Sequence, residues 1–311
     1  MNNPWSQVCS SGEFVLSDDR ESITAYNEQY GSRQDVQLHP ELLPEPFIGC
    51  PSAPVYLLSL NPGFSDEDRE LHRNEVFRRA VEGCLQHEER DWPFYYLNPA
   101  FADSPGAKWW TGKTRRLAEK VGMRTLAQNL FCVELFPYHS RKYQRIPKRI
   151  SPNGLVPSSE YSLRLVRQAI AEEKRIVVMR ARKHWEELVP ELRGYERRIC
   201  LNSAQNVCLS PGNMETSNFE ALVAECVGGR RRGKSCWGAS NVDSGVAEFR
   251  CTITDFANPG REYGLSPIPV SLDIWAQFLM AVGPSQHRCF HPGQLISRRR
   301  RDTEMHQSEG V

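Results

Sequence analysis

Four short apolar runs alternate along this chain with segments of helical pattern, and this alternation restricts the possible folds more than any other feature. The runs are VYLLSL from residue 55, LAQNLFCVELFP from 126, RIVVMR from 175 and NVCLSP from 206. Apolar runs of this kind are typical of strands buried on both faces, and the helices between them supply right-handed crossovers. The sequence therefore predicts an α/β fold with three layers, α/β/α, around a central four-stranded parallel sheet.

Composition divides the chain into three parts. Residues 1–50 are polar and rich in Pro towards their end, which predicts a lead-in that wraps the core. Residues 51–227 contain all four apolar runs and should form the main domain. Residues 228–311 begin with the basic, loop-like GGRRRGKSCWGASNVDSG, and we expect about the last 15 residues of this extension to be disordered.

Charge and cysteine content exclude several classes of protein. Hydrophobic residues make up 40% of 311 residues, enough for a packed core, and the net charge of +1 means that nucleic acid could bind only through local basic patches. Ten cysteines occur without a CxxC pair and without metal-ligand spacing, so we expect reduced thiols, no metal and no cofactor. The chain also lacks a signal-peptide pattern and an apolar segment of membrane-spanning length, which predicts a cytoplasmic monomer.

The ends of three predicted strands carry unusual residues. The first run leads into LNPG (60–63), the second into ELFPYHS (134–140) and the fourth into LSPGNM (209–214). Pro and Gly let a backbone turn sharply and approach a ligand closely, although either motif alone commonly just ends a strand. Because ligands of parallel sheets bind outside the carboxyl ends of the strands, two such motifs favour a binding site there.

The order of these motifs resembles the uracil-DNA glycosylase superfamily, and within it most nearly the mismatch-specific uracil and thymine-DNA glycosylases. SLNPG at 59–63 matches the first motif of that group at Asn, Pro and Gly, but has Ser59 where the group has Gly. PGAKWWTGKTRRLAEKVG, which follows, is similar to a segment of the group that precedes a helix ending in a Gly turn. SPGNM matches the second motif loosely, with Ser210 in place of Asn or His and Met214 where an apolar wedge is expected. The resemblance covers roughly residues 50 to 227.

The resemblance implies a monofunctional DNA glycosylase, a hydrolase that flips a base out of double-stranded or single-stranded DNA and leaves an abasic site. Its substrate would be a mismatched, damaged or modified base. In a bacterial host, where the protein would be associated with the nucleoid, a modified cytosine of phage DNA would make it an enzyme of antiviral defence. Two alternatives stay open: a non-catalytic sensor of altered nucleic acid on the same fold, and a nucleoside or nucleotide N-glycosidase.

Two residues are candidates for activating water. By the resemblance, Asn61 positions the attacking water through its side-chain oxygen, and because an amide cannot take a full proton it orients water without acting as a strong base. Asn before Pro is also typical of a turn or a helix cap, which is the competing interpretation. Asp66 is the second candidate, although acids in the first turn of a helix commonly complement the helix dipole.

The loop from residue 92 to residue 110 contains seven aromatic side chains in nineteen residues. Such density usually indicates core packing, and Trp109 or Trp110 could simply anchor the helix that follows. The resemblance nevertheless places the aromatic that stacks on the flipped base in this loop. We expect one of Tyr95, Tyr96 or Phe101 to be that platform.

Four further residues are candidates for base binding. Glu134 lies inside an apolar run, where a carboxylate without a partner is costly, so it should have a partner or a function. A carboxylate can accept a hydrogen bond from the N4 amino group of cytosine, which favours a cytosine-derived base. His139 follows on the same strand end, and the resemblance adds Gly63 and Phe64 beside the first motif.

Basic patches follow two of the predicted strands and could contact phosphates. A single charged run is commonly only a solvated surface, but two patches that flank one predicted cleft favour binding to DNA. The residues expected to contact DNA are Arg141, Lys142, Arg145, Lys148 and Arg231, together with Ser210, Pro211, Gly212, Asn213 and Met214 of the second motif.

Overall fold

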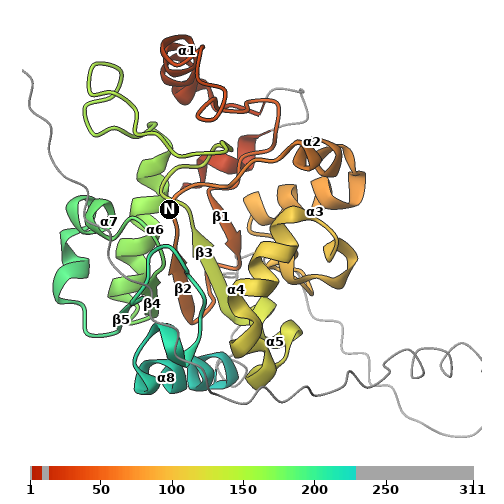
Figure 1. Cartoon of the computed structure of the whole chain (residues 1–311), viewed down its shortest axis with the longest axis vertical. Coiled ribbons are helices and arrows are strands. Elements are labelled where there is room, and N and C mark those ends of the chain that lie inside the picture. Colours follow the sequence, from red (N-terminus) through yellow and green to blue (C-terminus); the bar gives the residue numbers. More distant parts are fainter. Residues whose placement is uncertain (1, 9–13, 229–311) are drawn as a thin grey trace, which may run out of the picture. The chain divides into compact units, whose positions relative to one another are not determined.

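Five short strands form one sheet in the order β1-β3-β2-β4-β5 (Figure 1). The computed structural model describes residues 2–8 and 14–228. The strands are β1 (Phe47–Gly49), β2 (Val55–Leu58), β3 (Leu130–Val133), β4 (Arg175–Val178) and β5 (Arg198–Cys200). β2, β3, β4 and β5 pair in parallel, whereas β1 pairs antiparallel with the outer side of β3. The predicted α/β class is therefore confirmed, with a mostly parallel sheet of five strands.

Two details of the predicted sheet are wrong. The fourth parallel strand is Arg198–Cys200, and the apolar run from residue 206 forms no strand. Val207 and Leu209 are buried, but the Leu209 N–H donates to the carbonyl of Lys113 on a helix. Their apolar character therefore reflects packing beside a helix. The antiparallel strand β1 lies in the segment that was expected only to wrap the core.

Eight α-helices accompany the sheet among the described residues. They are α1 (Arg20–Gln29), α2 (Asp66–Arg73), α3 (Glu75–Leu85), α4 (Pro105–Val121), α5 (Met123–Asn129), α6 (Ser159–Ala171), α7 (Arg182–Leu188) and α8 (Thr216–Gly228). In Figure 1, α3, α4 and α5 lie to one side of the strands, and α6 and α7 lie to the other. Across these described helices, none is both long and apolar enough for a membrane span.

The chain after the first parallel strand forms two helices, α2 and α3, which are divided at Asn74. The Asn74 side chain accepts hydrogen bonds from the backbone N–H groups of Val76 and Phe77, at 3.0 and 3.1 Å. This is an N-cap, because a side-chain oxygen satisfies donors that the first turn of a helix leaves unpaired. Asn74 therefore ends α2 and starts α3.

The central strand β2 fixes the position of the loops that follow the sheet. All four of its residues are buried, as expected for a parallel strand covered on both faces. Leu58, its last residue, is level with Val133 of β3 and with Val178 of β4. Residues 59–63, 134–140 and 179–180 consequently begin side by side at one edge of the sheet.

The N-terminal segment is bound to the loop after β3. Backbone hydrogen bonds join His39 to His139, Glu45 to Pro137 and Glu134 to Pro46. Residues 39–46 therefore run along residues 134–139 and place Glu45 at the same edge of the sheet. The buried Asp19 adds a second attachment, since its carboxylate accepts from the Tyr138 hydroxyl (2.7 Å) and the Ser158 N–H (2.9 Å).

Candidate active site

A pocket of about 640 Å³ opens at the carboxyl ends of β2, β3 and β4. Its volume lies in the range typical of small-molecule sites, and its position is where open parallel sheets bind ligands. Residues 59–65, which directly follow β2, form one wall. The other lining residues are Glu45, Ile48, Asp68, Tyr96, Pro105, Gly106, Trp109, Trp110, Glu134, Ser140, Arg141, Lys142, Tyr143 and Arg180.

Asn61 lies in this pocket with its side chain held in one orientation. Its amide nitrogen donates to the Pro62 carbonyl (2.8 Å) and to the Ser140 hydroxyl (3.1 Å). Because a carbonyl can only accept, these contacts identify which end of the amide is nitrogen. Among the described residues nothing hydrogen-bonds to the amide oxygen Oδ1, which is left able to accept from a water molecule or a ligand.

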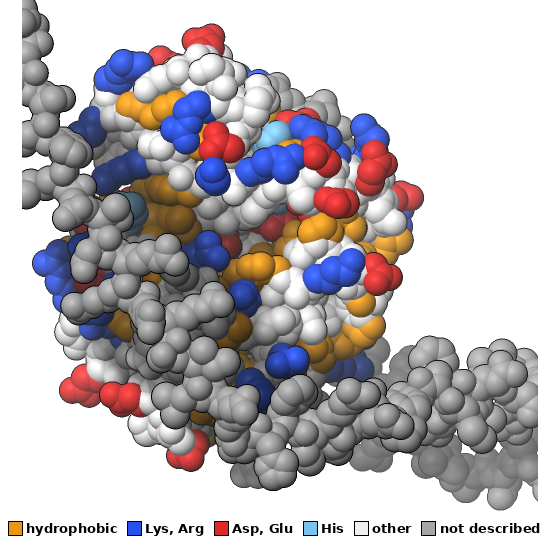
Figure 2. Space-filling view, viewed as in Figure 1, with side chains coloured by type: hydrophobic (Ala, Val, Ile, Leu, Met, Phe, Trp, Pro, Cys, Tyr) orange, Lys and Arg blue, Asp and Glu red, His pale blue; other side chains and the backbone are white. Residues whose placement is uncertain are grey.

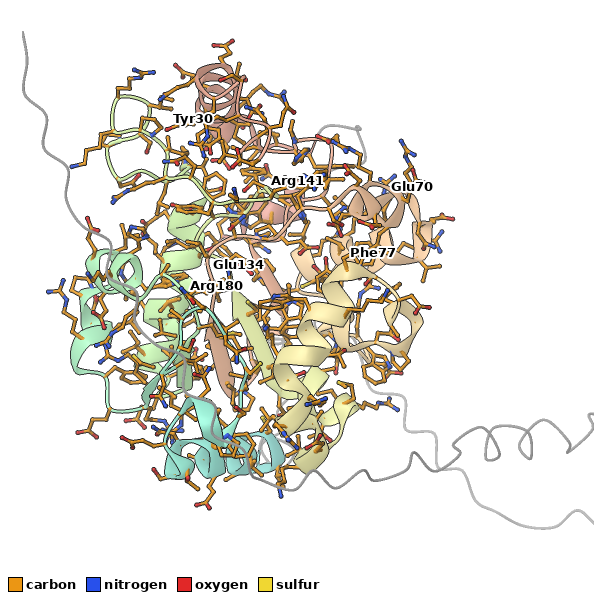
Figure 3. All side chains as sticks on the ribbon, in the orientation of Figure 1. Tyr30, Glu70, Phe77, Glu134, Arg141 and Arg180 are labelled. Atoms are coloured by element: carbon orange, nitrogen blue, oxygen red, sulfur yellow. The ribbon has the colours of Figure 1, made fainter. Side chains whose placement is uncertain are left out.

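Glu134 is a buried acid with one unpartnered oxygen. It directly follows β3, is only 3% exposed and lines the pocket. Burial raises its pKa to about 8, and the neighbouring Glu45 acts in the same direction, against hydrogen bonds from Ser59 and Cys132 and the positive charge of Arg180. Its Oε2 has no hydrogen-bond partner within the described part of the chain. In Figure 3, Glu134 and Arg180 extend from the ends of β3 and β4.

Glu45 is a second buried carboxyl group in the pocket wall. Its Oε1 accepts from the Tyr96 hydroxyl at 2.7 Å. Burial raises its pKa, while the adjacent His139 lowers it. Glu45 therefore has a hydroxyl donor and a histidine beside it, whereas Glu134 has an oxygen without a partner.

His139 lies behind the pocket wall and supports the first motif. Its ring nitrogens contact the carbonyl oxygens of Gly63 (Nδ1, 2.7 Å) and Leu43 (Nε2, 3.0 Å). Since both carbonyls can only accept, both contacts are hydrogen bonds together only when the ring is an imidazolium. The expected base-binding role is therefore replaced by a supporting one: His139 joins the loop of residues 61–63 to the N-terminal segment.

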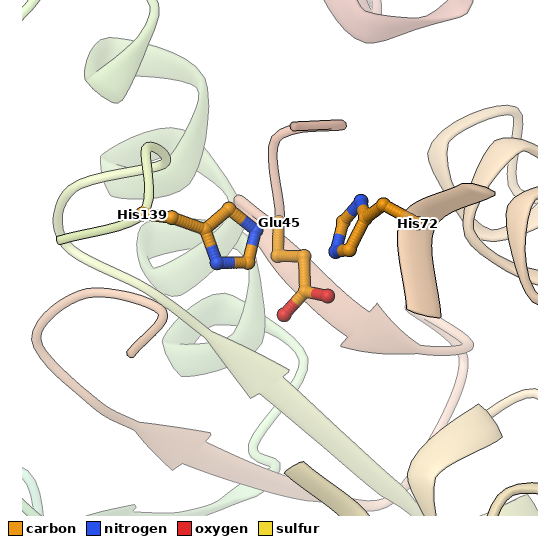
Figure 4. Close-up of side chains that lie close together, drawn as sticks. All are labelled: Glu45, His72 and His139. Carbon is orange, nitrogen blue, oxygen red and sulfur yellow. The ribbon is translucent and has the colours of Figure 1, made fainter. Parts of the chain in front are cut away.

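Glu45, His72 and His139 form a cluster whose potential ligand atoms all lie within 4.8 Å of one another (Figure 4). The Leu43 N–H donates to His72 Nδ1 (3.2 Å), which leaves the ring proton on Nε2. Both nitrogens of His139 face carbonyl oxygens, as described above. A histidine that binds a metal needs a deprotonated nitrogen with a free lone pair. Backbone groups contact three of the four ring nitrogens, and His72 Nε2 has no hydrogen-bond partner among the described residues.

The acidic cluster after the first motif belongs to the start of α2. Asp68 is buried, and its Oδ2 accepts from the Ser65 N–H (2.7 Å) and the Ser65 hydroxyl (3.0 Å), closing the first turn. Asp66 is exposed and bonded to Arg69 (2.9 Å) and Arg141 (2.6 Å). The Arg141 hydrogen bond holds the pKa of Asp66 below its usual value. Asp66 does not line the pocket, so the structure does not bring this second candidate to the site of Asn61.

The aromatic candidates are divided between core and pocket. Tyr95 and Phe101 are buried around Phe77, with ring centroids 5.6 and 5.2 Å from it, and neither lines the pocket. Tyr96 does line it, and packs so closely on α4 that a Cβ at Gly106 would overlap its ring. The density of aromatics in this loop is thus mainly core packing.

Phe64 and Trp109 are further aromatic residues of the pocket lining. Phe64 stacks on His39, with ring centroids 3.5 Å apart, and the guanidinium of Arg141 lies 5.2 Å from its centre. Trp109 is half-buried, with the guanidinium of Arg180 5.8 Å from its ring centre and the Lys113 ammonium 5.7 Å away. Both positions fit cation–π contact, and Trp109 offers pocket surface that a base could stack on.

The second motif does not line this pocket. Pro211, Gly212 and Asn213 form a short 3₁₀ turn after Ser210, and Asn213 binds the preceding loop through the carbonyl groups of Asn206 and Cys208. Met214 is 3% exposed. The expected wedge side chain is therefore part of the core, because it packs at the start of α8 instead of projecting from the surface.

Several of the residues predicted to bind phosphate are already paired with other groups of the chain. Arg141 and Lys142 line the pocket but pair with Asp66 (2.6 Å) and Asp35 (3.1 Å). Arg145 donates to the Asn153 carbonyl, and Lys148 is exposed. Arg231 lies outside the described residues. Figure 2 shows acidic side chains among the basic ones in the upper part of this face.

Glu45, Trp109 and Arg180 are pocket residues that the sequence did not identify as candidates. Glu45 stands in a Pro-rich stretch, and its role depends on pairing with the loop after β3, which no local pattern indicates. Arg180 could have been found, since it ends an apolar run at a strand end, as Glu134 does. The sequence allows either Trp109 or Trp110 to anchor the following helix, and Trp110 fills that role, with its ring 4.8 Å from that of Phe94.

Comparison of the chain with family models, with curated proteins and with solved structures found no match. The residues of the pocket themselves indicate its chemistry. Three groups matter for that chemistry: the oriented amide of Asn61, the unpartnered carboxyl of Glu134 and the guanidinium of Arg180. Among the described residues, Arg180 forms no ion pair.

Proposed function

We propose that this protein is a DNA glycosylase, which takes a base out of DNA into the pocket at the ends of β2 and β3 and hydrolyses its N-glycosidic bond. The observation that carries the proposal is the orientation of Asn61. Its nitrogen is bonded to Pro62 and Ser140, and its oxygen faces no protein partner in the described region. An amide fixed in this way can hold one water molecule for attack on the sugar.

The chemistry assigned to Asn61 fits what the reaction requires. Breaking an N-glycosidic bond builds positive charge on the sugar, so a weak nucleophile such as water is sufficient if it is well placed. A neutral amide can orient the water but cannot remove its proton in full. The departing base then needs help, and the buried acid Glu134 lies in the same pocket.

The resemblance to the uracil-DNA glycosylase superfamily supports the same proposal. SLNPG directly follows the buried central strand, and SPGNM comes after the last strand of the sheet. Four of the five strands are parallel and adjacent, so we propose the three-layer, four-stranded parallel core of that superfamily, with β1 added at its edge. The buried position of Met214 departs from the resemblance, because no wedge projects from that motif.

A strand-cleavage assay tests the proposal. Labelled oligonucleotides, single-stranded and duplex, would be incubated with the full chain and then treated with alkali, which breaks DNA only where a base has left. We expect cleavage with the natural protein and a loss of at least about 100-fold with Asn61→Ala, since correct positioning of water is lost. Binding of Asn61→Ala to duplex DNA with an abasic-site analogue should stay within about three-fold, because Asn61 contacts the water and not the DNA backbone. Full activity in Asn61→Ala would refute the role of Asn61.

A nucleoside or nucleotide N-glycosidase is the second candidate, and one observation favours it. Two of the expected phosphate contacts, Arg141 and Lys142, are already paired with acids, and Met214 is buried. A small-molecule enzyme would need only the pocket. Release of free base from nucleosides, with no alkali-labile sites in any DNA, would select this candidate. Binding of DNA without release of a base from either substrate would instead indicate a sensor.

A further inference from the structure

The floor of the pocket contains a buried acid whose hydrogen bonds are incomplete. Glu134 is 3% exposed, and Ser59 and the thiol of Cys132 (3.7 Å from Oε1) are donors beside it, yet Oε2 has no hydrogen-bond partner among the described residues. An unsatisfied buried carboxyl group destabilises a fold, so its presence needs a reason. Glu45, a second buried acid of the pocket, accepts a hydrogen bond from Tyr96 on Oε1.

We propose that Glu134 is a catalytic residue that selects an amino-bearing base, with one carboxyl oxygen accepting from the exocyclic amino group and the other giving its proton to the adjacent ring nitrogen. The inference rests on the proposed function and specifies its substrate class. Cytosine-type and adenine-type bases present a ring nitrogen next to an amino group, and a neutral carboxylic acid is complementary to that pair. Burial, which raises the pKa of Glu134 to about 8, keeps the proton on the acid at neutral pH.

A proton from Glu134 allows the base to leave as a neutral molecule. The proton passes from the carboxyl group to the ring nitrogen, and the bond from the sugar carbon to the base then breaks with its electron pair going to the base. The base leaves neutral. The water held by Asn61 forms the new bond to the sugar carbon and releases a proton to solvent, from which Glu134 is protonated again. Amino-bearing bases leave poorly as anions, so an acid at this position provides what Asn61 alone cannot.

The charged and titratable groups around Glu134 come from several elements. Glu45 and Tyr96 approach from the N-terminal segment and the aromatic loop, Cys132 from β3 and Arg180 from the end of β4. Glu45 disfavours ionisation of Glu134, and Arg180 favours it. Proton transfer to a bound base leaves a carboxylate beside Arg180, so the guanidinium stabilises the product state of the transfer.

The test compares the natural chain with Glu134→Gln, which keeps the size of the side chain and removes the acidic proton. Bases released from DNA containing cytosine, 5-substituted cytosines, adenine, uracil or thymine would be identified by mass spectrometry. We expect release of an amino-bearing base, and a rate lower by about 100- to 10,000-fold in Glu134→Gln. The natural rate should fall above about pH 8 as Glu134 loses its proton, and this fall should be absent from the residual activity of the variant.

Control variants and measurements distinguish a failure of this inference from a failure of the proposed function. Glu119→Gln, on the exposed surface of α4, should leave the rate unchanged. Thermal unfolding and binding to abasic-analogue DNA would show that Glu134→Gln is folded. Release of only uracil or thymine, or an unchanged rate in a folded Glu134→Gln, would overturn the inference and leave the glycosylase intact. Release of no base from any DNA would overturn the proposed function, and the inference with it.

Discussion

At the scale of single residues, the pocket depends on side chains that orient other side chains. Asn61 is held by Ser140, and the Ser140 hydroxyl in turn donates to the Lys142 carbonyl at 3.1 Å. His139, one position earlier, bonds to the Gly63 carbonyl. The loop after β3 therefore sets the geometry of the loop after β2. Active-site groups need such support, because small misplacements of a catalytic group lower the rate strongly.

Ser140→Ala tests this support. Removing the hydroxyl leaves Asn61 bonded only to Pro62 and the Ser140 backbone, so its side chain is less well fixed. One lost hydrogen bond of about 0.5–1.5 kcal/mol predicts a fall in kcat of about 2- to 12-fold. Single-turnover base release would measure it, with exposed Ser6→Ala as the matched control. A change in KM alone would contradict a positioning role.

At the scale of elements, two acidic residues at the start of α2 have different roles. Asp68 closes the first turn with Ser65, while Asp66 faces solvent and joins α2 to Arg141 of the loop after β3. Exposed ion pairs contribute little to stability, so the capping contact matters more. Asp68 therefore caps α2.

Asp68→Ala should lower the free energy of unfolding by about 1–2 kcal/mol, because the Ser65 N–H loses its acceptor. Chemical denaturation would measure the loss. Glu70→Ala, on the exposed side of the same helix, should change the free energy by less than about 0.5 kcal/mol. Equal effects of the two substitutions would show that the cap does not stabilise α2.

The elements that the sequence predicted well are those with a clear apolar pattern. In β2 every position is apolar, in β4 every position after Arg175 is apolar, and in α4 and α6 the apolar residues repeat with helical period. β1 is three residues long in a Pro-rich stretch and becomes a strand only by pairing with β3. β5 is equally short, so the more apolar run from residue 206 was chosen in its place.

The site was predictable to the extent that it follows strand ends. Glu134 directly follows β3 and Asn61 lies three residues after the end of β2, and the parallel arrangement brings them to one pocket. The pocket role of Glu45 depends on hydrogen bonds with residues about ninety positions away, so no short motif could reveal it. The aromatic loop could not be interpreted from sequence, because core and pocket use the same residue types. Only the contacts of Tyr95 and Phe101 with Phe77 show that these two rings belong to the core.

At the scale of the whole molecule, buried titratable groups set the pH dependence of stability. Burial raises the pKa of Glu134 to about 8 and raises those of Glu45 and Asp19, so the folded chain binds more protons than the unfolded chain above about pH 5. Burial lowers the pKa of His87 to about 4, with the opposite effect below about pH 6.5. The contributions of the buried acids and of His87 to the pH dependence of stability oppose one another near pH 5–6. Above that range, only the acids of this group contribute.

The free energy of unfolding should therefore fall as pH rises from 6.5 to 8, by about 2 kcal/mol from Glu134 alone. Glu134→Gln should remove that part of the fall, because Gln does not titrate. Denaturation curves at pH 6.5 and 8 would measure the difference, with the exposed Glu160→Gln as control. A fall of equal size in Glu134→Gln and the natural chain would show that Glu134 is not its source.

The attachment of the N-terminal segment has a consequence for synthesis on the ribosome. The Asp19 carboxylate can accept its hydrogen bonds only once Tyr138 and Ser158 have been synthesised, and residues 39–46 likewise need residues 134–139 as partners. Residues 19 and 39–46 must therefore wait without these hydrogen-bond partners until residue 158 has been synthesised. Slow translation before residue 158 would prolong that exposed state and increase misfolding and aggregation of nascent chains.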